Sequence, residues 1–490
     1  MSPSPLIDRD TEKRKLMELT TSGRRHLALL TGRRRVGKSF LLTNTWPDSK
    51  YFLFTAAQVT PEANRRQLIL DLAAWSGQEY RPDDYPTWRT VFNLLLSLPA
   101  DRPRVIVLDE FQYLAEKESG LAAVASELNA AWERPGRTNP LLVVLAGSLI
   151  STMEALNTGG APLYGRFTWQ HRLQPFDYWY AAEAAPYPQL RDRATLYGAF
   201  GGTPRYLTAV DTNQTLERNI QNLLLATDGE VRTLLETALD QEAGLRDTAK
   251  YRSILLAVAG GATERNEIGN RTGMPNDRGL REKLDTLVAL EYLERRGNVD
   301  AKPTDTARYA IADPALRFFH RFVEPNRSLS ERLPPERVWK ERVAEDLDQY
   351  MGHEFERIAM QAYDRHASRL GLPAVEVWGR WEGVDRQRRS LEIDVVAPLV
   401  DGRTLTGAIK WNRRPIGADV HFAHLSQLER ASNAGRAWAH SALLPHAPLL
   451  YVAAGGFTPA FKAAVAESGR DVTMWDLTDV YRGHPVDEAH

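Results

Sequence analysis

The sequence predicts an α/β fold that begins with a doubly wound parallel sheet, and three observations favour it. Short, nearly continuous apolar runs alternate with amphipathic segments over the first third of the chain, which is typical of strands buried on both faces and of the helices that cover them. A glycine-rich loop follows the first apolar run, and two acidic residues close a later one. The runs therefore predict the fold class, and the two polar motifs indicate its chemistry.

The apolar runs of this sheet are near-continuous, so each is expected to be a buried strand. They cover residues 26–30, 51–54, 105–108 and 141–145. Helices are expected between them, at residues 64–75 and 121–132. After about residue 174 the strand signal fades, and the chain up to residue 240 is expected to be helical.

Residues 248–323 have a different order of elements. Three helical segments and a possible hairpin follow one another, which suits a winged helix-turn-helix. Its third segment, residues 277–296, would be the one that contacts DNA. However, the positive charge of its basic residues is offset by three acids, Asp277, Glu282 and Asp285. DNA contact and service as a packing or regulatory lid both stay open for this helix.

Beyond residue 335 the sequence predicts a further α/β domain. Its expected elements are a helix at 346–365, strands at 373–381, 390–397 and 404–411, and a β-α-β unit over 449–477.

Length and composition limit the functional classes. A chain of 490 residues is too long for one hydrophobic core, so three or four domains are expected. With a formal net charge of −1, the protein would have to bind nucleic acid through a local patch. The lack of cysteine excludes disulfides, thiolate zinc sites and cysteine nucleophiles. There is no signal-peptide core and no apolar run of roughly 20 residues, the length of a membrane helix, so we expect a cytoplasmic protein without membrane contact.

The glycine-rich loop fits the phosphate-binding pattern G-x-x-x-x-G-K-S in full. Glycines allow a tight loop whose backbone N–H groups surround phosphates, and the helix that follows adds its positive dipole end. Lys38 is expected to reach the β- and γ-phosphates, and the Ser39 hydroxyl is expected to bind Mg²⁺. ATP and Mg²⁺ are therefore the predicted cofactors. The predicted nucleotide contacts are Gly32, Arg33, Arg34, Arg35, Val36, Gly37, Lys38, Ser39 and Phe40.

The ends of two later strands supply the expected hydrolytic groups. Asp109 and Glu110 close the run at 105–108; Asp109 is predicted to complete the Mg²⁺ shell, and Glu110 to orient and deprotonate the attacking water. Ser148 closes the next run. Its hydroxyl is predicted to reach the γ-phosphate or the water, and the alternative is a cap for the helix that follows.

Two arginines are candidates for further phosphate contacts. Arg166 is a candidate arginine finger that would reach the γ-phosphate of a neighbouring subunit, so a homo-oligomer is expected; an ordinary surface salt bridge is the alternative. Arg205 is a weaker candidate for the role called sensor 2 in AAA+ proteins, where Ser148 would be sensor 1.

Several segments together carry a resemblance to a known family. They are Ile7-Asp-Arg9, Thr31–Ser39, Leu108–Tyr113, Leu163–Arg166 and Gly201–Pro204, and they resemble the archaeal-type ATPases, which are related to AAA+ and STAND proteins. The resemblance implies an AAA+ P-loop core at 1–172, a helical lid at 173–240, a winged helix at 241–328 and a restriction-endonuclease-like domain at 329–490. It also implies that Ile7 and Arg9 lie near the adenine.

The C-terminal domain resembles nucleases of the PD-(D/E)xK type, in which acids and a lysine gather metal ions that activate water. Glu356, Asp394 and Lys410 match that pattern, but Ala408 stands where the family usually carries an acid. Glu392 could compensate, because a spacing of two residues on a strand places it on the face of Asp394. An active nuclease, a domain that binds nucleic acid without cutting, and a protein-binding domain all stay open.

Basic and aromatic residues follow the lysine of that pattern. Lys410, Arg413 and Arg414 with Trp411 form a local patch of the kind that contacts phosphates, or else a solvated edge.

The sequence thus predicts an ATP-hydrolysing AAA+ protein that acts on nucleic acid, DNA more readily than RNA. The alternative is a signalling or defence-type switch whose added domains bind a protein partner.

Overall fold

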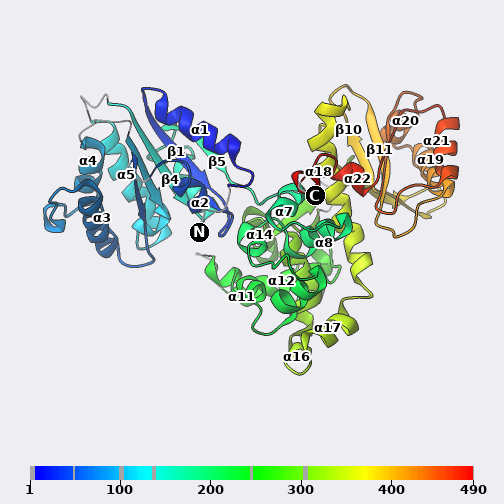
Figure 1. The fold of residues 1–490 in the computed structure, drawn as a ribbon, viewed down its shortest axis with the longest axis horizontal. Coiled ribbons are helices and arrows are strands. Elements are labelled where there is room, and N and C mark those ends of the chain that lie inside the picture. The colour runs from blue at the N-terminus through cyan, green and yellow to red at the C-terminus, as the bar shows by residue number, and fades with distance from the viewer. Residues whose placement is uncertain are drawn as a thin grey trace. The chain divides into compact units, whose positions relative to one another are not determined.

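The computed structural model describes most of the chain. The described residues are 6–47, 50–98, 104–134, 139–242, 245, 247–301 and 307–488. They divide into two compact units (Figure 1). The first unit is residues 1–175 with 203–205 and 240–246, and the second is residues 176–202, 206–239 and 247–490. None of the described helices combines the length and the apolar character that crossing a membrane requires.

A five-stranded parallel sheet forms the centre of the first unit, as the fold class predicted. Its strands are β1 (Arg25–Thr31), β2 (Tyr51–Thr55), β3 (Arg104–Asp109), β4 (Leu141–Gly147) and β5 (Phe167–Arg172), in the order β2-β3-β4-β1-β5. The apolar runs account for the first four strands. The edge strand β5 was not predicted, because its side chains alternate between exposed and half-buried positions and form no apolar run.

Helices cover both faces of this sheet (Figure 1). They are α1 (Asp10–Thr21), α2 (Lys38–Thr43), α3 (Pro61–Ser76), α4 (Trp88–Ser97), α5 (Leu121–Trp132) and α6 (Ile150–Glu154). On β1, Leu27 and Leu29 pack into the core with α3, α4 and α5. Ala28 and Leu30 pack into the opposite core with α1 and α2. Both faces of β1 are buried, which is why its apolar run has no polar interruption.

The second unit begins with short helices. Those before residue 240 are α7 (Tyr178–Ala184), α8 (Leu190–Phe200), α9 (Pro204–Leu207), α10 (Leu216–Ile220) and α11 (Glu230–Glu236), although residues 203–205 belong to the first unit. They are followed by α12 (Thr248–Ala259), α13 (Arg265–Thr272), α14 (Arg278–Ala289) and the antiparallel pair β6 (Leu293–Arg296) and β7 (Arg308–Ile311). Helix α14 is shorter than the expected segment 277–296, because Glu291 has a left-handed φ of 61° and residues from Leu293 onward pair as a strand.

The C-terminal part of the second unit contains a four-stranded mixed sheet. Its strands are β10 (Val395–Pro398), β11 (Thr404–Lys410), β12 (Leu449–Ala453) and β13 (Val472–Trp475), and only the β10–β11 pair is antiparallel. The other elements are α15 (Pro314–Phe318), α16 (Arg327–Ser330), α17 (Pro335–Arg342), α18 (Leu347–Leu370), α19 (Ala418–Asn433), α20 (Ala437–Ala442), α21 (Pro459–Glu467), α22 (Leu477–Val480) and α23 (Pro485–Glu488).

Two expectations for this region were wrong. The strand expected at 373–381 begins only at β8 (Trp381–Val384), which pairs with β9 (Ser390–Ile393) in a separate two-stranded sheet. The strand expected at 390–397 is interrupted at Asp394, a bend that lies between β9 and β10. The chain leaves one sheet and enters another at this residue, and an apolar pattern alone does not mark such a change.

Candidate nucleotide site

The glycine-rich loop lies between β1 and α2, as its motif predicted. Gly37 has a φ of 96°, a left-handed conformation that glycine adopts without steric cost. Gly32 is required for space, because a Cβ there would lie 2.7 Å from the carbonyl oxygen of Leu173. These glycines allow the loop to fold back over the start of α2.

Lys38 lies inside the loop. Its side chain is 5% exposed, and its Nζ donates hydrogen bonds to the carbonyl oxygens of Gly32 at 2.7 Å and Arg33 at 3.1 Å. Burial lowers the pKa of Lys38, although Glu110 and Asp109 oppose this shift. The ammonium is therefore held by the backbone of the loop that is expected to receive the phosphates.

Ser39 and Asp109 form the pair that would hold Mg²⁺. The Ser39 hydroxyl donates to Asp109 Oδ2 at 2.5 Å, and Asp109 Oδ1 accepts the backbone N–H of Glu110 at 2.9 Å. Asp109 is 1% exposed and burial raises its pKa, whereas Ser39 is exposed. A hydroxyl and a carboxylate are hard oxygen donors of the kind that Mg²⁺ prefers, so this donor set fits the predicted ion.

Glu110 lies at the end of β3 in a left-handed conformation, with a φ of 51°, and such strain clusters at functional sites. Its Oε2 accepts hydrogen bonds from the Ser148 hydroxyl at 2.8 Å, the Ser148 N–H at 3.3 Å and the Gln112 amide. The alternative role of Ser148 as a helix cap is not seen, because Leu149 is the N-cap of α6 and no side chain caps it.

Gln112 is a site residue that the sequence did not reveal. It lies in a short 3-10 turn, Phe111–Leu114, is 3% exposed, and donates to both Glu110 and, at 3.4 Å, the Ser148 hydroxyl. A Cβ at Gly147 would lie 2.3 Å from its Oε1, so the end of β4 leaves space for this amide. Gln112 belongs to the segment Leu108–Tyr113 that carried the family resemblance. However, no sequence motif known from the residues alone predicts a role for an amide two residues after the acids.

Two consecutive loop residues contact distant parts of the first unit, and a third lies near another. Val36 accepts a hydrogen bond through its carbonyl from Arg9 at 3.3 Å, and Arg9 also donates to Gln174 O at 2.8 Å. Arg35 donates to Gln241 Oε1 at 2.9 Å. A Cβ at Gly37 would lie 3.8 Å from the Pro204 ring. The loop is therefore braced by Arg9, which also contacts Gln174, and by Gln241.

The other predicted nucleotide contacts have varied positions. Arg9 is 5% exposed and binds loop carbonyls, whereas Ile7 is half-buried. Arg33 is half-buried, Arg34 donates to the Tyr113 hydroxyl, and Phe40 is 43% exposed. Arg205 is exposed on α9, immediately after Pro204.

Arg166 lies on the turn before β5. It forms an ion pair with Glu133 at 3.2 Å and its side chain is 42% exposed. The salt bridge that was the alternative to an arginine finger is thus present in the single chain. An exposed pair of this kind contributes about 1 kcal/mol at most, so it would not prevent the guanidinium from exchanging partners.

The four residues of the nuclease-like pattern separate into two groups. Lys410 donates to Asp394 Oδ2 at 2.8 Å, and the same oxygen accepts the Ile409 N–H at 3.0 Å. Glu356 lies 4.0 Å from Arg380 and 3.8 Å from His353, and Glu392 also pairs with Arg380. Among the described residues, no three His, Asp or Glu side chains form a group that could hold a metal ion.

Glu392 does not share a strand face with Asp394. The expected spacing argument required one continuous strand, but Glu392 lies on β9, opposite Glu382, and the chain bends at Asp394. The suggestion that Glu392 replaces the acid missing at Ala408 was therefore wrong.

Comparisons with known proteins show what the chain is similar to. Residues 319–423 match the model of DUF234, described as archaeal and bacterial proteins of unknown function. The chain is 24% identical over 412 residues to the uncharacterized protein MJECL04 of Methanocaldococcus jannaschii, a match that covers 83% of this chain and 87% of that protein. These matches accompany a phosphate-binding loop on a five-stranded parallel sheet. The chain is thus similar, over residues 319–423, to archaeal and bacterial proteins of unknown function.

Solved structures similar to this chain include two from archaea. The Walker-type ATPase PABY2304 of Pyrococcus abyssi has a TM-score of 0.48 and 21% identity, over 64% of this chain and 96% of that chain. The ORC2 protein of Aeropyrum pernix, in ADPNP–ADP complexes, has a TM-score of 0.42 and 14% identity, over 71% of this chain and 95% of that chain. These similarities concern the fold alone.

The basic patch predicted around Trp411 is largely neutralised. Lys410 pairs with Asp394, and Arg413 pairs with Asp348 at 2.9 Å. The Trp411 indole N–H donates to Asp348 at 3.1 Å, and the guanidinium of Arg191 lies 3.9 Å from the centre of a Trp411 ring. The aromatic face and two of the cations are thus engaged within the protein, which a count of basic residues did not reveal.

Proposed function

We propose that this protein is an archaeal-type AAA+ P-loop ATPase that binds ATP with Mg²⁺ and hydrolyses it, and that hydrolysis drives an action on nucleic acid. The observation that carries the proposal is the position of Glu110. Its carboxylate is fixed by Ser148 at 2.8 Å, one residue after the Asp109 that binds Ser39 of the P-loop. A carboxylate held beside a magnesium site is suited to orient and deprotonate water.

Each residue of the site has a distinct chemical role in this proposal. Lys38 exchanges its bonds with the loop carbonyls for bonds with phosphate oxygens, which places its charge on the leaving phosphates. Ser39 and Asp109 hold Mg²⁺, which neutralises phosphate charge when bound. Glu110 accepts the proton of the attacking water, and Ser148 and Gln112 set the orientation of its carboxylate. Burial of these groups strengthens their electrostatic interactions.

Ser148→Ala is expected to lower the rate of ATP hydrolysis about tenfold, because it removes a hydrogen bond of about 1–2 kcal/mol that orients Glu110. Phosphate release and ATP titration would measure the effect, and ATP affinity should stay within about threefold of wild type, less than 1 kcal/mol. In a Glu110→Gln background the same substitution should have little further effect, since it acts through Glu110. A full additional loss there would contradict this role.

The action on nucleic acid, DNA in preference to RNA, is supported by the order of elements after residue 247. Three helices and a two-stranded antiparallel pair follow one another, as in a winged helix, and α14 would be the DNA-contacting helix. Arg278 on α14 is 90% exposed in its side chain, although it pairs with Glu282. Such a pair is weak in water, and phosphates could compete for it.

The test is ATP turnover in the presence of duplex DNA, single-stranded DNA and RNA at low salt. The proposal expects turnover to rise with DNA and the effect to fall as salt increases, because phosphate contacts release counterions. If no nucleic acid changes the rate of ATP turnover or the oligomeric state, an action on nucleic acid is excluded. The proposal of ATP hydrolysis is not affected by that result.

A protein partner is the second candidate, and the neutralised basic patch favours it. Asp348 and Asp394 bind the cations that would otherwise meet phosphates. The Glu110→Gln chain, loaded with ATP, would serve as bait in a pull-down. Recovery of nucleic acid without a specific protein would count against this candidate.

For the C-terminal domain we propose nucleic-acid binding without cutting. Ala408 removes one acid of the nuclease pattern, and Glu356 and Glu392 pair with Arg380 instead of joining Asp394. Labelled DNA and RNA incubated with Mg²⁺ or Mn²⁺, with and without ATP, should stay intact. Cleavage that disappears in Lys410→Ala would show an active nuclease instead.

Arg166 is proposed to act across a subunit interface of a homo-oligomer. Arg166→Ala and Lys38→Ala chains are each expected to be inactive alone. A mixture should regain part of the ATPase activity, because some interfaces then combine an intact P-loop with an intact Arg166 from the neighbour. Absence of rescue in an oligomer that exchanges subunits would argue against action in trans.

A further inference from the structure

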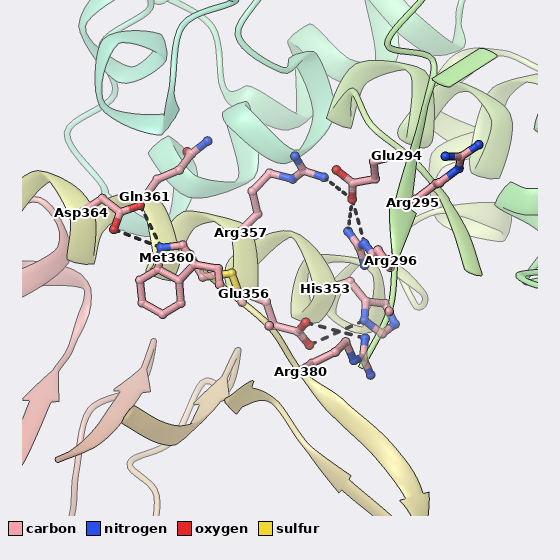
Figure 2. Close-up of a pocket in the computed structure, with 13 residues that line it drawn as sticks. Glu294, Arg295, Arg296, His353, Glu356, Arg357, Met360, Gln361, Asp364 and Arg380 are labelled. Atoms are coloured by element: carbon pink, nitrogen blue, oxygen red, sulfur yellow. Dashed lines mark hydrogen bonds and ion pairs between the residues drawn. The ribbon is translucent and has the colours of Figure 1, made fainter. Parts of the chain in front are cut away.

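A cavity of about 390 Å³ lies within the second unit, between strand β6, helix α18 and residues 378–380 (Figure 2). Asp394 and Lys410 are not among its lining residues, so it is separate from the nuclease-like pair. Its volume falls in the range of about 300–1,000 Å³ typical of small-ligand sites. The cavity therefore has room for a ligand of mononucleotide size.

One side of this cavity carries more positive than negative charge. Arg296 and Arg357 share a single carboxylate, Glu294, at 2.7 Å and 2.9 Å. The adjacent Arg317 pairs with the fully buried Glu354. On the lining itself, two guanidinium groups thus share one carboxylate; Arg317 and Glu354 form a pair of their own and do not line the cavity. Burial, the largest cause, lowers the pKa of Arg296, and Arg317 and Arg357 add to that shift while Glu294 opposes it.

An unsatisfied donor lies on the same side. The Nε of Arg357 is buried and has no hydrogen-bond partner among the described residues, a condition that folded proteins usually avoid. An arginine fork offers parallel N–H groups that match phosphate oxygens. A phosphate placed against the terminal nitrogens of Arg296 and Arg357 would supply negative charge to two guanidinium groups that share one carboxylate.

The other sides of the cavity differ in character. Glu356 faces Arg380 and His353, and Arg380 also pairs with Glu382 and Glu392, so the Arg380 side has no excess of positive charge. Met360 and Trp378 provide apolar surface. The indole N–H of Trp378 donates to the carboxylate of Asp364 at 2.9 Å and 3.0 Å, which fixes the ring.

We propose that this cavity binds a phosphorylated ligand of mononucleotide size. Its phosphate would be held by Arg296 and Arg357, and its uncharged part would lie against Met360 and Trp378. The ligand could be a free nucleoside monophosphate or the 5′-phosphorylated end of a strand, because both present the same group. The site does not depend on ATP hydrolysis at the P-loop.

Binding would be measured by calorimetry on the full chain carrying Lys38→Ala, so that the P-loop contributes no phosphate site. The probes are inorganic phosphate, AMP, and one oligonucleotide with and without a 5′-phosphate. Binding of AMP would identify a free nucleotide as the ligand. Binding of the oligonucleotide only when it is phosphorylated would identify a strand end. Binding of inorganic phosphate alone would confirm the anion site but not the contacts with the uncharged part.

Arg296→Gln is expected to weaken phosphate-dependent binding at least about tenfold, since it removes charge-assisted hydrogen bonds. The matched control is Arg308→Gln. Arg308 lies opposite Arg296 in the β6–β7 pair, so this substitution removes the same charge from the neighbouring strand. Arg308 contacts Glu264 and Glu382 and does not line the cavity, so its replacement should leave binding nearly unchanged. If Arg296→Gln fails to fold, Arg357→Lys keeps the charge, loses the fork and should also weaken binding. The proposal is overturned if no probe binds, or if both glutamine variants bind as the parent does.

Discussion

Replacing Lys38 by alanine is expected to lower the affinity for ATP at least about a hundredfold, because two charge-assisted hydrogen bonds of about 1.5–3 kcal/mol each are lost. The ammonium lies inside the loop, 2.7 Å from Gly32 O and 3.1 Å from Arg33 O, and no other lysine occurs between residues 16 and 49. Equilibrium titration with ATP and Mg²⁺ would measure the change.

Lys15→Ala is the matched control for this prediction. Lys15 is half-exposed and pairs only weakly with Glu18 across one turn of α1, so its loss should leave ATP binding as in wild type. A thermal melt of each variant separates loss of binding from loss of fold. Wild-type affinity in Lys38→Ala would refute the assignment of the loop as the ATP site.

Glu110→Gln is expected to retain bound ATP and to lower hydrolysis by about 10²–10⁴-fold, the usual contribution of a general base. Glutamine has the same shape and keeps an oxygen that can accept the hydrogen bond from Ser148. It cannot take a proton from water near neutral pH. Single-turnover phosphate release and ATP titration on the same sample would separate chemistry from binding.

Glu116→Gln provides the comparison, since Glu116 is an exposed acid six residues further along. Its hydrolysis rate should equal that of the wild-type chain. Unchanged phosphate release in Glu110→Gln would remove that residue from its assigned role and would leave the base to be found elsewhere.

The first sheet was predictable because its central strands are buried on both faces. On β1, Leu27 and Leu29 pack into one core, and Ala28 and Leu30 pack into the other. Because both faces are buried, the strand is a continuous apolar run in the sequence. The edge strand β5 has no such run, since one of its sides is exposed. A similar limit applies at Asp394, where a single bend moves the chain between two sheets.

The candidate site was predictable where one motif fixes both residue type and backbone. The P-loop supplies Lys38 and Ser39, and the end of strand β3 supplies Asp109. The two motifs together place these three residues in one site. Contacts set by tertiary packing were not predictable. The amide of Gln112 reaches Glu110 through a 3-10 turn. In the patch around Trp411, the indole N–H bonds to Asp348, a residue 63 positions away in the sequence.

The bracing of the P-loop has a consequence for how nucleotide state is communicated. Its contact with Gln241, and the contact of its partner Arg9 with Gln174, lie at or beside points where the chain passes between the two compact units. Any rearrangement of Arg35, Val36 and Gly37 on exchange of ATP for ADP must be accommodated at these passages. Free-energy coupling between two binding events is reciprocal. If a ligand of the second unit changes the affinity for nucleotide by some factor, nucleotide changes the affinity for that ligand by the same factor. The contacts of Arg35 and Val36 thus place the phosphate loop next to the chain segments that lead into the second unit.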